Sequence, residues 1–387
     1  MSETKKELPK LFRQKSGASL PESFADPALY LSGTVFANPN PNPEILPDGG
    51  VRVYYEDAEA REVLLRGMSQ DTGFGDRLIP LTKDADGVWS VVLRDIRPGF
   101  HYCTFVVDGR DVTSSKLPIY WGYARNNNAI EVPDPDLDYC DIQEVPHGQV
   151  RHEWYWSRIT GRWRQMLLYT PPGYDGGTEA YPVVYLLHGS GESETGWIMQ
   201  GKANFIVDNL IAQGKIPPVI LAMEHGYAHR PGTRELDVNQ NNVFPELLAE
   251  ETVPFVEQHY RTDGTRLIAG LSMGGQQTLF AALDHPELFS AVGIFSSGFF
   301  SPMRGPGFDQ GGLLEQWDLA RFREHCRYLY MAIGKDDFLW QVAQATHALF
   351  EQHQIEHELR ITEGTHEWRC WRDYLHDFLP KAFEKLS

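Results

Sequence analysis

The segment 265–280 constrains the fold of this chain more than any other part of the sequence. An apolar run at residues 267–269 leads directly into Gly270-Leu271-Ser272-Met273-Gly274, and a helical pattern follows over residues 276–283. This arrangement predicts a strained strand-to-helix turn, because a β-carbon on either side of the serine would collide with a neighbouring element. Ser272 would then present its hydroxyl at the positive end of a helix, where an oxyanion can be stabilised. The alternative interpretation is a glycine-rich turn without chemistry.

Size and charge narrow the classes of partner. The chain has 387 residues, which suggests two domains, and its net charge is −18. That charge argues against nucleic acid or an anionic membrane surface as a partner, and no apolar run approaches the length of a transmembrane helix. A neutral or weakly charged substrate fits better. The 10 Trp, 17 Tyr and 20 Phe residues suit sugar or phenolic ligands, although most are expected in the core.

The N-terminus indicates the cell compartment, and the cysteine spacing indicates whether a metal or redox site is present. The first eight residues carry charge but no apolar segment, which predicts a cytoplasmic protein, or an extracellular or periplasmic one if a signal has been removed. The cysteines at 103, 140, 326 and 370 lack CxxC spacing, so they indicate neither a zinc site nor a redox motif. We expect reduced thiols, with a Cys326–Cys370 bridge as the alternative, and we expect no metal and no cofactor.

The first third of the chain has the pattern of a β-sandwich. Residues 1–27 are polar and predict a flexible lead-in, and residues 28–135 form the sandwich. Short alternating segments are separated by turn signals such as Asp86-Gly87 and Asp108-Gly109. The segments are 51–55, 62–66, 88–93 and 102–107.

This first domain resembles the immunoglobulin-like module of the isoamylase and glycogen-binding type. The resemblance is carried by residues 81–90, Leu-Thr-Lys-Asp-Ala-Asp-Gly-Val-Trp-Ser, and by residues 99–109, Gly-Phe-His-Tyr-Cys-Thr-Phe-Val-Val-Asp-Gly. It implies a fold like that of carbohydrate-binding modules. Trp89 is interpreted as a core residue, with a sugar platform as the alternative.

Residues 136–387 alternate strands and helices, which predicts a doubly wound sheet of the α/β-hydrolase type. Continuous apolar runs at 181–187, 219–223, 291–297 and 328–334 are typical of strands buried on both faces. Helical patterns cover 204–213, 244–260, 338–353 and 369–383, and 357–361 is the last strand.

The chain order serine, acid, histidine of this fold locates two further catalytic candidates. Asp336 and Asp337 both follow the strand at 328–334, and His366 lies on the loop after the last strand. His366 is expected to be the general base and Asp337 the carboxylate that orients it, with Asp336 as the alternative. The histidines at 285, 347, 353 and 357 are assigned to helix or strand surfaces.

An acyl-transfer site also needs two amide donors for the tetrahedral oxyanion. The Met273 N–H, directly after the serine, is one candidate. The other is expected in the loop that follows the strand 181–187, from Ser190 or Gly189. His188 in that loop is predicted to shape the turn.

The second domain resembles the feruloyl and acetyl-xylan esterases of carbohydrate esterase family one, which share the esterase D fold. The motifs are residues 169–174, Tyr-Thr-Pro-Pro-Gly-Tyr; 185–192, Tyr-Leu-Leu-His-Gly-Ser-Gly-Glu; 270–275; and 364–368, Gly-Thr-His-Glu-Trp. The family pattern G-x-x-D after the strand favours Asp337. The resemblance implies hydrolysis of feruloyl esters on xylan or its oligosaccharides. Trp197, Trp340 and Trp368, which lie near the motifs in sequence, are candidate walls for the substrate.

Three other functions stay open. An acetyl-xylan esterase or a siderophore esterase acting on a catecholate trilactone would use the same catalytic fold, although the net charge disfavours an anionic iron complex. A glycan-binding protein with an inactive hydrolase domain is disfavoured by the intact serine, acid and histidine. The sequence does not decide whether the β-sandwich binds glycan or shapes the active site, and a homodimer stays open.

Overall fold

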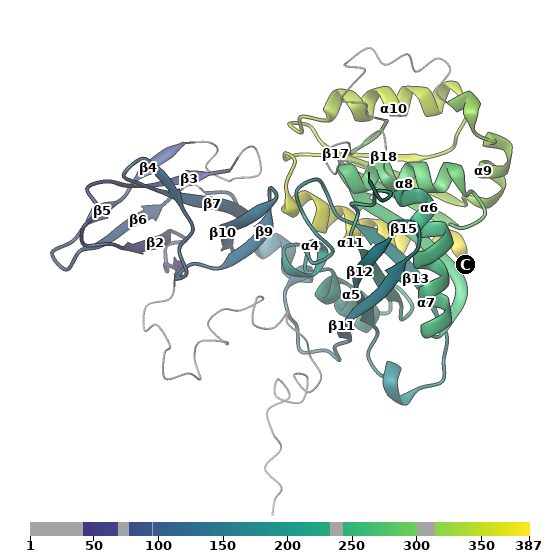
Figure 1. Ribbon diagram of the computed structural model, residues 1–387, viewed down its shortest axis with the longest axis horizontal. Coiled ribbons are helices and arrows are strands. Elements are labelled where there is room, and N and C mark those ends of the chain that lie inside the picture. The colour runs from purple at the N-terminus through teal and green to yellow at the C-terminus, as the bar shows by residue number, and fades with distance from the viewer. Residues whose placement is uncertain (1–41, 69–76, 95, 233–242, 300–313) are drawn as a thin grey trace, which may run out of the picture.

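The computed structural model describes residues 42–68, 77–94, 96–232, 243–299 and 314–387. The lead-in predicted at residues 1–27 lies outside them. Figure 1 shows a β-rich N-terminal region beside a larger region in which helices flank a central sheet. None of the described helices has the length and apolar character needed to cross a bilayer.

The N-terminal region consists of two antiparallel sheets. One has the strand order β1-β2-β6-β5, and the other has the order β4-β3-β7-β10-β9, with β8 paired to β7. The strands are β1 (Glu44–Ile45), β2 (Val51–Glu56), β3 (Val63–Gly67), β4 (Leu78–Pro80), β5 (Thr82–Lys83), β6 (Val88–Leu93), β7 (Gly99–Val107), β8 (Arg110–Val112), β9 (Ile119–Gly122) and β10 (Arg125–Val132).

Side chains from both sheets share one apolar core. Val53 of β2 and Trp89 of β6 pack in the same cluster as Leu65 of β3 and Phe105 of β7. Trp89 is buried, and its indole N–H donates to the Asp57 carbonyl at 2.8 Å. Trp89 is therefore a core residue, as its sequence context indicates.

The hairpin of β9 and β10 was not predicted from the sequence. Its turn consists of Tyr123 and Ala124, with φ angles of 52° and 57°. Two-residue hairpin turns with positive φ usually carry asparagine, aspartate or glycine. The sequence therefore lacked the signal by which the other hairpins were recognised.

The C-terminal region is built on an eight-stranded sheet with the order β11-β12-β14-β13-β15-β16-β17-β18. β11 is antiparallel to β12, and β12 is antiparallel to β14. From β14 to β18 in this sheet order, each pair of neighbouring strands is parallel. The strands are β11 (Gln149–Ser157), β12 (Arg162–Thr170), β13 (Tyr181–Leu187), β14 (Ile220–Glu224), β15 (Thr262–Leu271), β16 (Ala291–Phe295), β17 (Tyr328–Gly334) and β18 (Glu358–Thr362). The predicted α/β architecture is confirmed.

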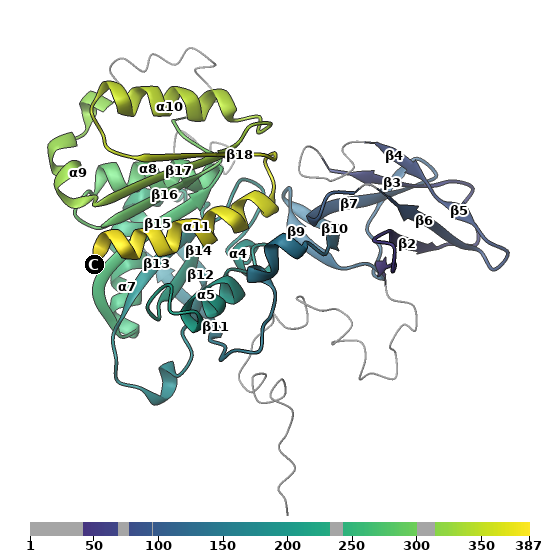
Figure 2. The same ribbon diagram turned by 180° about the vertical axis from the view of Figure 1, so that it is seen from behind.

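Helices cover both faces of this sheet, so each central strand is buried on both sides. Alternate residues of β13 enter different cores: Val184 and Leu186 pack on one face, and Val183, Tyr185 and Leu187 pack on the other. Figure 2 shows α11 across one face with α5 beside it. The helices are α4 (Gly196–Met199), α5 (Ala203–Ala212), α6 (Phe244–Leu247), α7 (Val253–His259), α8 (Met273–Asp284), α9 (Leu319–His325), α10 (Trp340–Gln352) and α11 (Trp368–Leu386).

The single helix expected over 244–260 is interrupted. A π-helical turn at Leu248–Thr252 separates α6 from α7, and Pro254 lies in the first turn of α7. Proline has no N–H to donate, so the regular hydrogen-bond ladder cannot run through this point.

The two regions share a core and an ion pair between a buried arginine and a partly exposed glutamate. Phe100, Tyr102 and Tyr120 of the N-terminal region pack in the same cluster as α5 and α11. Arg372 of α11 is buried and donates to both carboxylate oxygens of Glu131 in β10, at 2.7 and 3.1 Å. Burial raises the pKa of Glu131, but attraction to Arg372 and Lys202 outweighs it and lowers the pKa to about 2. This contact fixes one region against the other.

Candidate active site

Ser272 lies at the turn between β15 and α8, with φ 51° and ψ −119°. A positive φ is strained for a residue with a β-carbon, so surrounding contacts must hold it. The Ser272 N–H donates to the Phe295 carbonyl at 2.9 Å, and the Ser297 hydroxyl donates to the Ser272 carbonyl at 2.6 Å. β16 and the residues after it therefore support the turn.

The glycines around Ser272 are required by close packing. A β-carbon on Gly274 would lie 2.5 Å from the His188 carbonyl oxygen and 2.6 Å from that of Leu187. A β-carbon on Gly270 would lie 2.5 Å from the Gly274 carbonyl carbon. The first turn of α8 therefore rests directly on the end of β13, which brings Ser272 next to the loop that follows β13.

His366 and Asp337 meet where β17 and β18 end. The His366 Nδ1 atom lies 3.0 Å from both Asp337 carboxylate oxygens, and the Asp337 side chain is fully buried. Because a carboxylate can only accept, Nδ1 carries the proton, which leaves Nε2 as the ring's acceptor nitrogen. Asp336 is exposed, so Asp337 is the aspartate that orients the histidine.

Ser272 and His366 line one pocket. Among the described residues its walls come from both regions of the chain: Tyr102, Tyr123, Gly189, Ser190, Glu192, Leu271, Ser272, His366 and Trp371. The ring centroid of His366 lies 4.4 Å from that of Phe338 and 5.0 Å from that of Trp371. Phe338 is largely exposed. The histidine is therefore held between two aromatic side chains.

The predicted oxyanion donors lie around this pocket. The Met273 N–H is at the first position of α8, where amides have no partner inside the helix. In the facing loop, the Gly191 N–H donates to the Tyr227 hydroxyl at 2.6 Å, while Gly189 and Ser190 border the pocket. The Gly191 amide is therefore occupied, and the Ser190 and Gly189 amides both remain candidates for the second donor, with Ser190 preferred from the sequence.

His188 holds this loop as a neutral ring. Its Nδ1–H donates to the Gly189 carbonyl at 2.8 Å, and its Nε2 accepts from the Gly226 N–H at 2.8 Å. Burial, with His225 acting in the same direction, lowers the pKa of His188 to about 3. His188 therefore shapes the turn, which is the role its position predicts.

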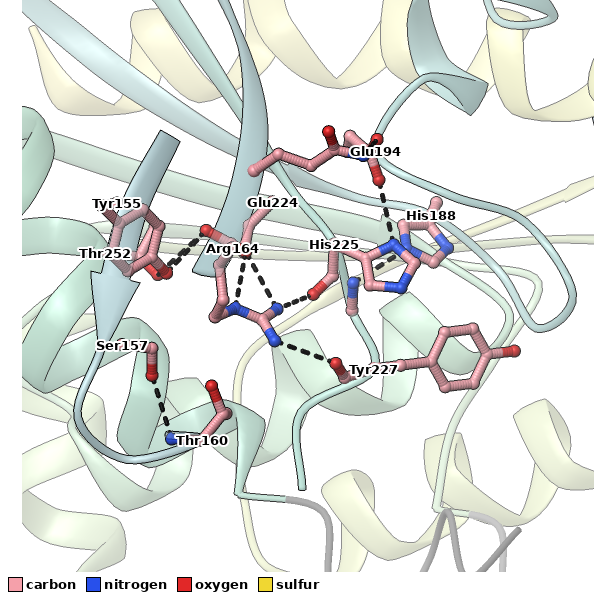
Figure 3. A network of polar contacts seen from close by, with 12 residues as sticks. Tyr155, Ser157, Thr160, Arg164, His188, Glu194, Glu224, His225, Tyr227 and Thr252 are labelled. Carbon is pink, nitrogen blue, oxygen red and sulfur yellow. Dashed lines mark hydrogen bonds and ion pairs between the residues drawn. The ribbon is translucent and has the colours of Figure 1, made fainter. Parts of the chain in front are cut away.

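A buried ion pair supports the segment that contacts His188. Figure 3 shows Arg164 paired with Glu224 while its other nitrogens donate to the carbonyls of His225 and Tyr227. Tyr227 in turn contacts the loop at Gly191. The guanidinium thus positions residues 225–227, and these residues position the loop beside Ser272.

Two of the three tryptophans proposed as substrate walls belong to the core instead. Trp197 and Trp368 are each 1% exposed and pack edge to face at 5.3 Å between ring centroids. The Trp197 indole donates to the Leu187 carbonyl, and that of Trp368 donates to Glu192. Trp340 packs in a small cluster with Ile333 and does not border the pocket.

Aromatic walls are instead supplied by Trp371, Tyr102 and Tyr123. Trp371 follows Trp368 by three residues, so it lies about one turn further along α11. Tyr102 and Tyr123 come from the N-terminal region, where no sequence signal connected them with a catalytic site. The Ala124 N–H donates to the Gly191 carbonyl at 2.7 Å and holds the β9–β10 turn against the oxyanion loop.

Glu192 is a further pocket residue whose role the sequence did not reveal. One carboxyl oxygen accepts from the Trp368 indole at 3.0 Å and from the Tyr102 hydroxyl at 3.2 Å. The other oxygen is buried and has no hydrogen-bond partner among the described residues. Burial raises the pKa of Glu192 to about 8, against the lowering effect of those two hydrogen bonds. Glu192 thus connects the N-terminal region with the helix that begins beside His366.

The cysteine side chains are free thiols. All four cysteines are unbonded, and Cys103, Cys140 and Cys370 are buried. The Cys326–Cys370 bridge considered from the sequence is not formed.

A family model named Esterase matches residues 157–382, more than half of the chain. The chain belongs to the Esterase family. An endo-1,4-beta-xylanase/feruloyl esterase of Xylanibacter ruminicola is 31% identical over 353 residues. That alignment covers 88% of this chain but 46% of the relative, so the chain spans about half the relative's length.

Solved structures show the same fold as this esterase. The enterobactin esterase of Shigella flexneri has a TM-score of 0.65 at 17% identity and covers 87% of this chain and 94% of its own. A ferulic acid esterase of Anaeromyces mucronatus has a TM-score of 0.55 at 22% identity, and the match covers 66% of this chain and 97% of that esterase.

Replacement of the nucleophile should abolish turnover by the esterase. We expect Ser272→Ala to lower kcat by at least about 10⁴-fold, because no other group can form the acyl-enzyme. Ser190→Ala is the matched control in the same pocket, and it should retain most activity because the loop contributes backbone amides. Steady-state hydrolysis of an aryl ester measures the activity of both variants, and circular dichroism verifies that they fold. Turnover by Ser272→Ala near the wild-type rate would contradict the mechanism.

The two neighbouring aspartates provide a second matched pair. Asp337→Asn should reduce kcat by about 10³- to 10⁴-fold, because an amide no longer favours the Nδ1–H tautomer of His366. Asp336→Asn, exposed and one residue away, should stay within about twofold of wild type. Equal losses in both variants would show that Asp337 has no special role.

Glu192 should make stability depend on pH. Its pKa is about 8 in the folded esterase and 4.5 as the ordinary value, so the folded state binds the extra proton between these limits. Its contribution to the free energy of unfolding is therefore complete below about pH 4.5 and is lost as pH rises through 8. Urea unfolding at pH 5, 7 and 9 should show a steeper decline for wild type than for Glu192→Gln. Parallel pH profiles would contradict this assignment.

Proposed function

We propose that this esterase hydrolyses hydroxycinnamoyl esters, such as feruloyl groups on xylan or its oligosaccharides. The observation that carries the proposal is the pocket itself, in which Ser272 and His366 share walls with Tyr102, Tyr123 and Trp371. Aromatic side chains favour a planar phenolic ring through stacking and edge contacts. The relative from Xylanibacter ruminicola, named a xylanase/feruloyl esterase, supports the same substrate class.

The proposed reaction proceeds through an acyl-enzyme. His366 Nε2 accepts the Ser272 proton while the serine oxygen attacks the ester carbonyl, and Asp337 stabilises the imidazolium. The Met273 and Ser190 amides donate to the tetrahedral oxyanion. His366 then protonates the departing sugar oxygen as the bond to the acyl carbon breaks. A water molecule, deprotonated by His366, releases the hydroxycinnamic acid and restores the serine.

A catecholate trilactone esterase is the second candidate. The enterobactin esterase of Shigella flexneri aligns with 87% of this chain, including much of the N-terminal region. The charge of the pocket favours the feruloyl ester, however. Its described walls include no lysine or arginine, and the net charge of the chain is −18. An anionic iron complex would receive little attraction from such a site.

Substrate comparison with one wall variant tests the proposal. Wild type should show a higher kcat/KM for methyl ferulate than for a short acetyl ester or a catecholate trilactone. Tyr123→Ala should lower kcat/KM for methyl ferulate by about 2- to 10-fold, the value of one aromatic contact. The same variant should leave the acetyl ester nearly unchanged, because its acyl group is too small to reach the ring.

Trp121→Ala is the matched control for the ferulate measurement. Trp121 lies two residues before Tyr123 and is 43% exposed, but it does not border the pocket. Its loss should leave the kinetics for all three esters unchanged. Preferential hydrolysis of the trilactone would replace the proposed function with the second candidate.

A further inference from the structure

The last crossover of the sheet carries a group of side chains that catalysis does not use. α10 begins three residues after Asp337 and extends for 13 residues, about 20 Å at 1.5 Å per residue. β18 then returns toward the loop of His366 (Figures 1 and 2). The junction of α10 and β18 therefore lies at the opposite end of this unit from the catalytic pair.

Three side chains converge at this junction. His347 and Glu351 are four residues apart on α10 and thus share one face of the helix, while His357 directly precedes β18. Their ligand atoms all lie within 4.8 Å of one another. Within the described part of the chain, this is the one group of three or more histidine, cysteine or carboxylate side chains that meets such a spacing.

The backbone orients the His357 ring for metal binding. Its Nδ1 lies 2.8 Å from the Ile355 carbonyl oxygen, which can only accept, so Nδ1 carries the proton. The Nε2 lone pair therefore faces His347 and accepts from its Nδ1–H at 2.7 Å, and a metal ion bound between the two rings would displace that proton. A histidine whose second nitrogen donates to a backbone carbonyl is a typical metal ligand.

Glu351 adds a negative charge beside the two imidazoles. Its carboxylate has no hydrogen bond or ion pair among the described residues, although it lies within reach of the histidine pair. The nearby Arg323 donates to the His353 carbonyl. A carboxylate and two imidazoles form a donor set that a divalent metal ion would complete.

We propose that His347, Glu351 and His357 bind a Zn²⁺ ion. Two imidazoles and one carboxylate are donors suited to zinc, with a water molecule as the fourth ligand. Zn–N and Zn–O bonds of about 2.0 Å in a tetrahedron place the donors about 3.3 Å apart. The imidazole nitrogens would separate by roughly half an ångström from their present 2.7 Å, and the carboxylate would move inward.

The bound ion would join the end of α10 to the start of β18. Asp337 precedes this helix and His366 follows this strand, so the metal would stabilise the unit that presents both residues. It would remain at the far end of the helix and would not contact the substrate. The site contains no CxxC motif, because its ligands are histidine and glutamate with spacings of four and six residues.

Calorimetric titration of the chelator-treated, tag-free full chain with ZnCl₂ tests the site. We expect saturation with one equivalent in the micromolar range and an accompanying rise in Tm. CoCl₂ should give the visible d–d bands of a four-coordinate ion, whereas MgCl₂, which prefers oxygen ligands, should produce neither effect. His357→Ala and Glu351→Gln should each weaken Zn²⁺ binding by at least about tenfold.

His259→Ala is the control, since His259 is an exposed histidine on α7 and lies outside the group. It should bind Zn²⁺ like wild type. Esterase activity of the metal-free variants verifies that they fold. Absence of saturable Zn²⁺ binding by wild type, or equal binding by wild type and His357→Ala, would overturn the proposal.

Discussion

The contact between the first turn of α8 and the end of β13 is the constraint on which the catalytic arrangement depends. Gly274 has space for no β-carbon, since one would lie 2.5 Å from the His188 carbonyl oxygen. This approach requires the positive φ of Ser272 and brings the serine beside Gly189 and Ser190. The nucleophile and its amide donors are therefore products of one packing contact, which strand order and the neutral His188 ring maintain.

The N-terminal region is part of the active site as well as a neighbour of it. Tyr102 and Tyr123 border the pocket, and the backbone of Ala124 bonds to the oxyanion loop. The ion pair between the buried Arg372 and the partly exposed Glu131 holds the two regions together. The structure therefore supports a shaping role for the β-sandwich, because its position determines which rings a substrate would meet.

Much of the fold and the main candidates for chemistry could be predicted from local patterns. Alternating and continuous apolar runs indicated most strands, and the motifs containing Ser272, Asp337 and His366 were recognised within a few residues. The residues that line the pocket could not be predicted in this way. Trp197 and Trp368 were proposed because they lie near motifs in sequence, yet their side chains point into the core. Proximity along a chain does not determine the direction of a side chain.

The sequence by itself determined the features that depend on short-range chemistry: the strained turn at Ser272, the order of serine, acid and histidine, and the alternation of strands and helices. Only the tertiary structure decided the surroundings of Glu192. Its partners Tyr102 and Trp368 lie 90 and 176 residues away, and burial among them raises its pKa to about 8. Desolvation results from the packing of distant segments, so no local pattern of residues can specify it.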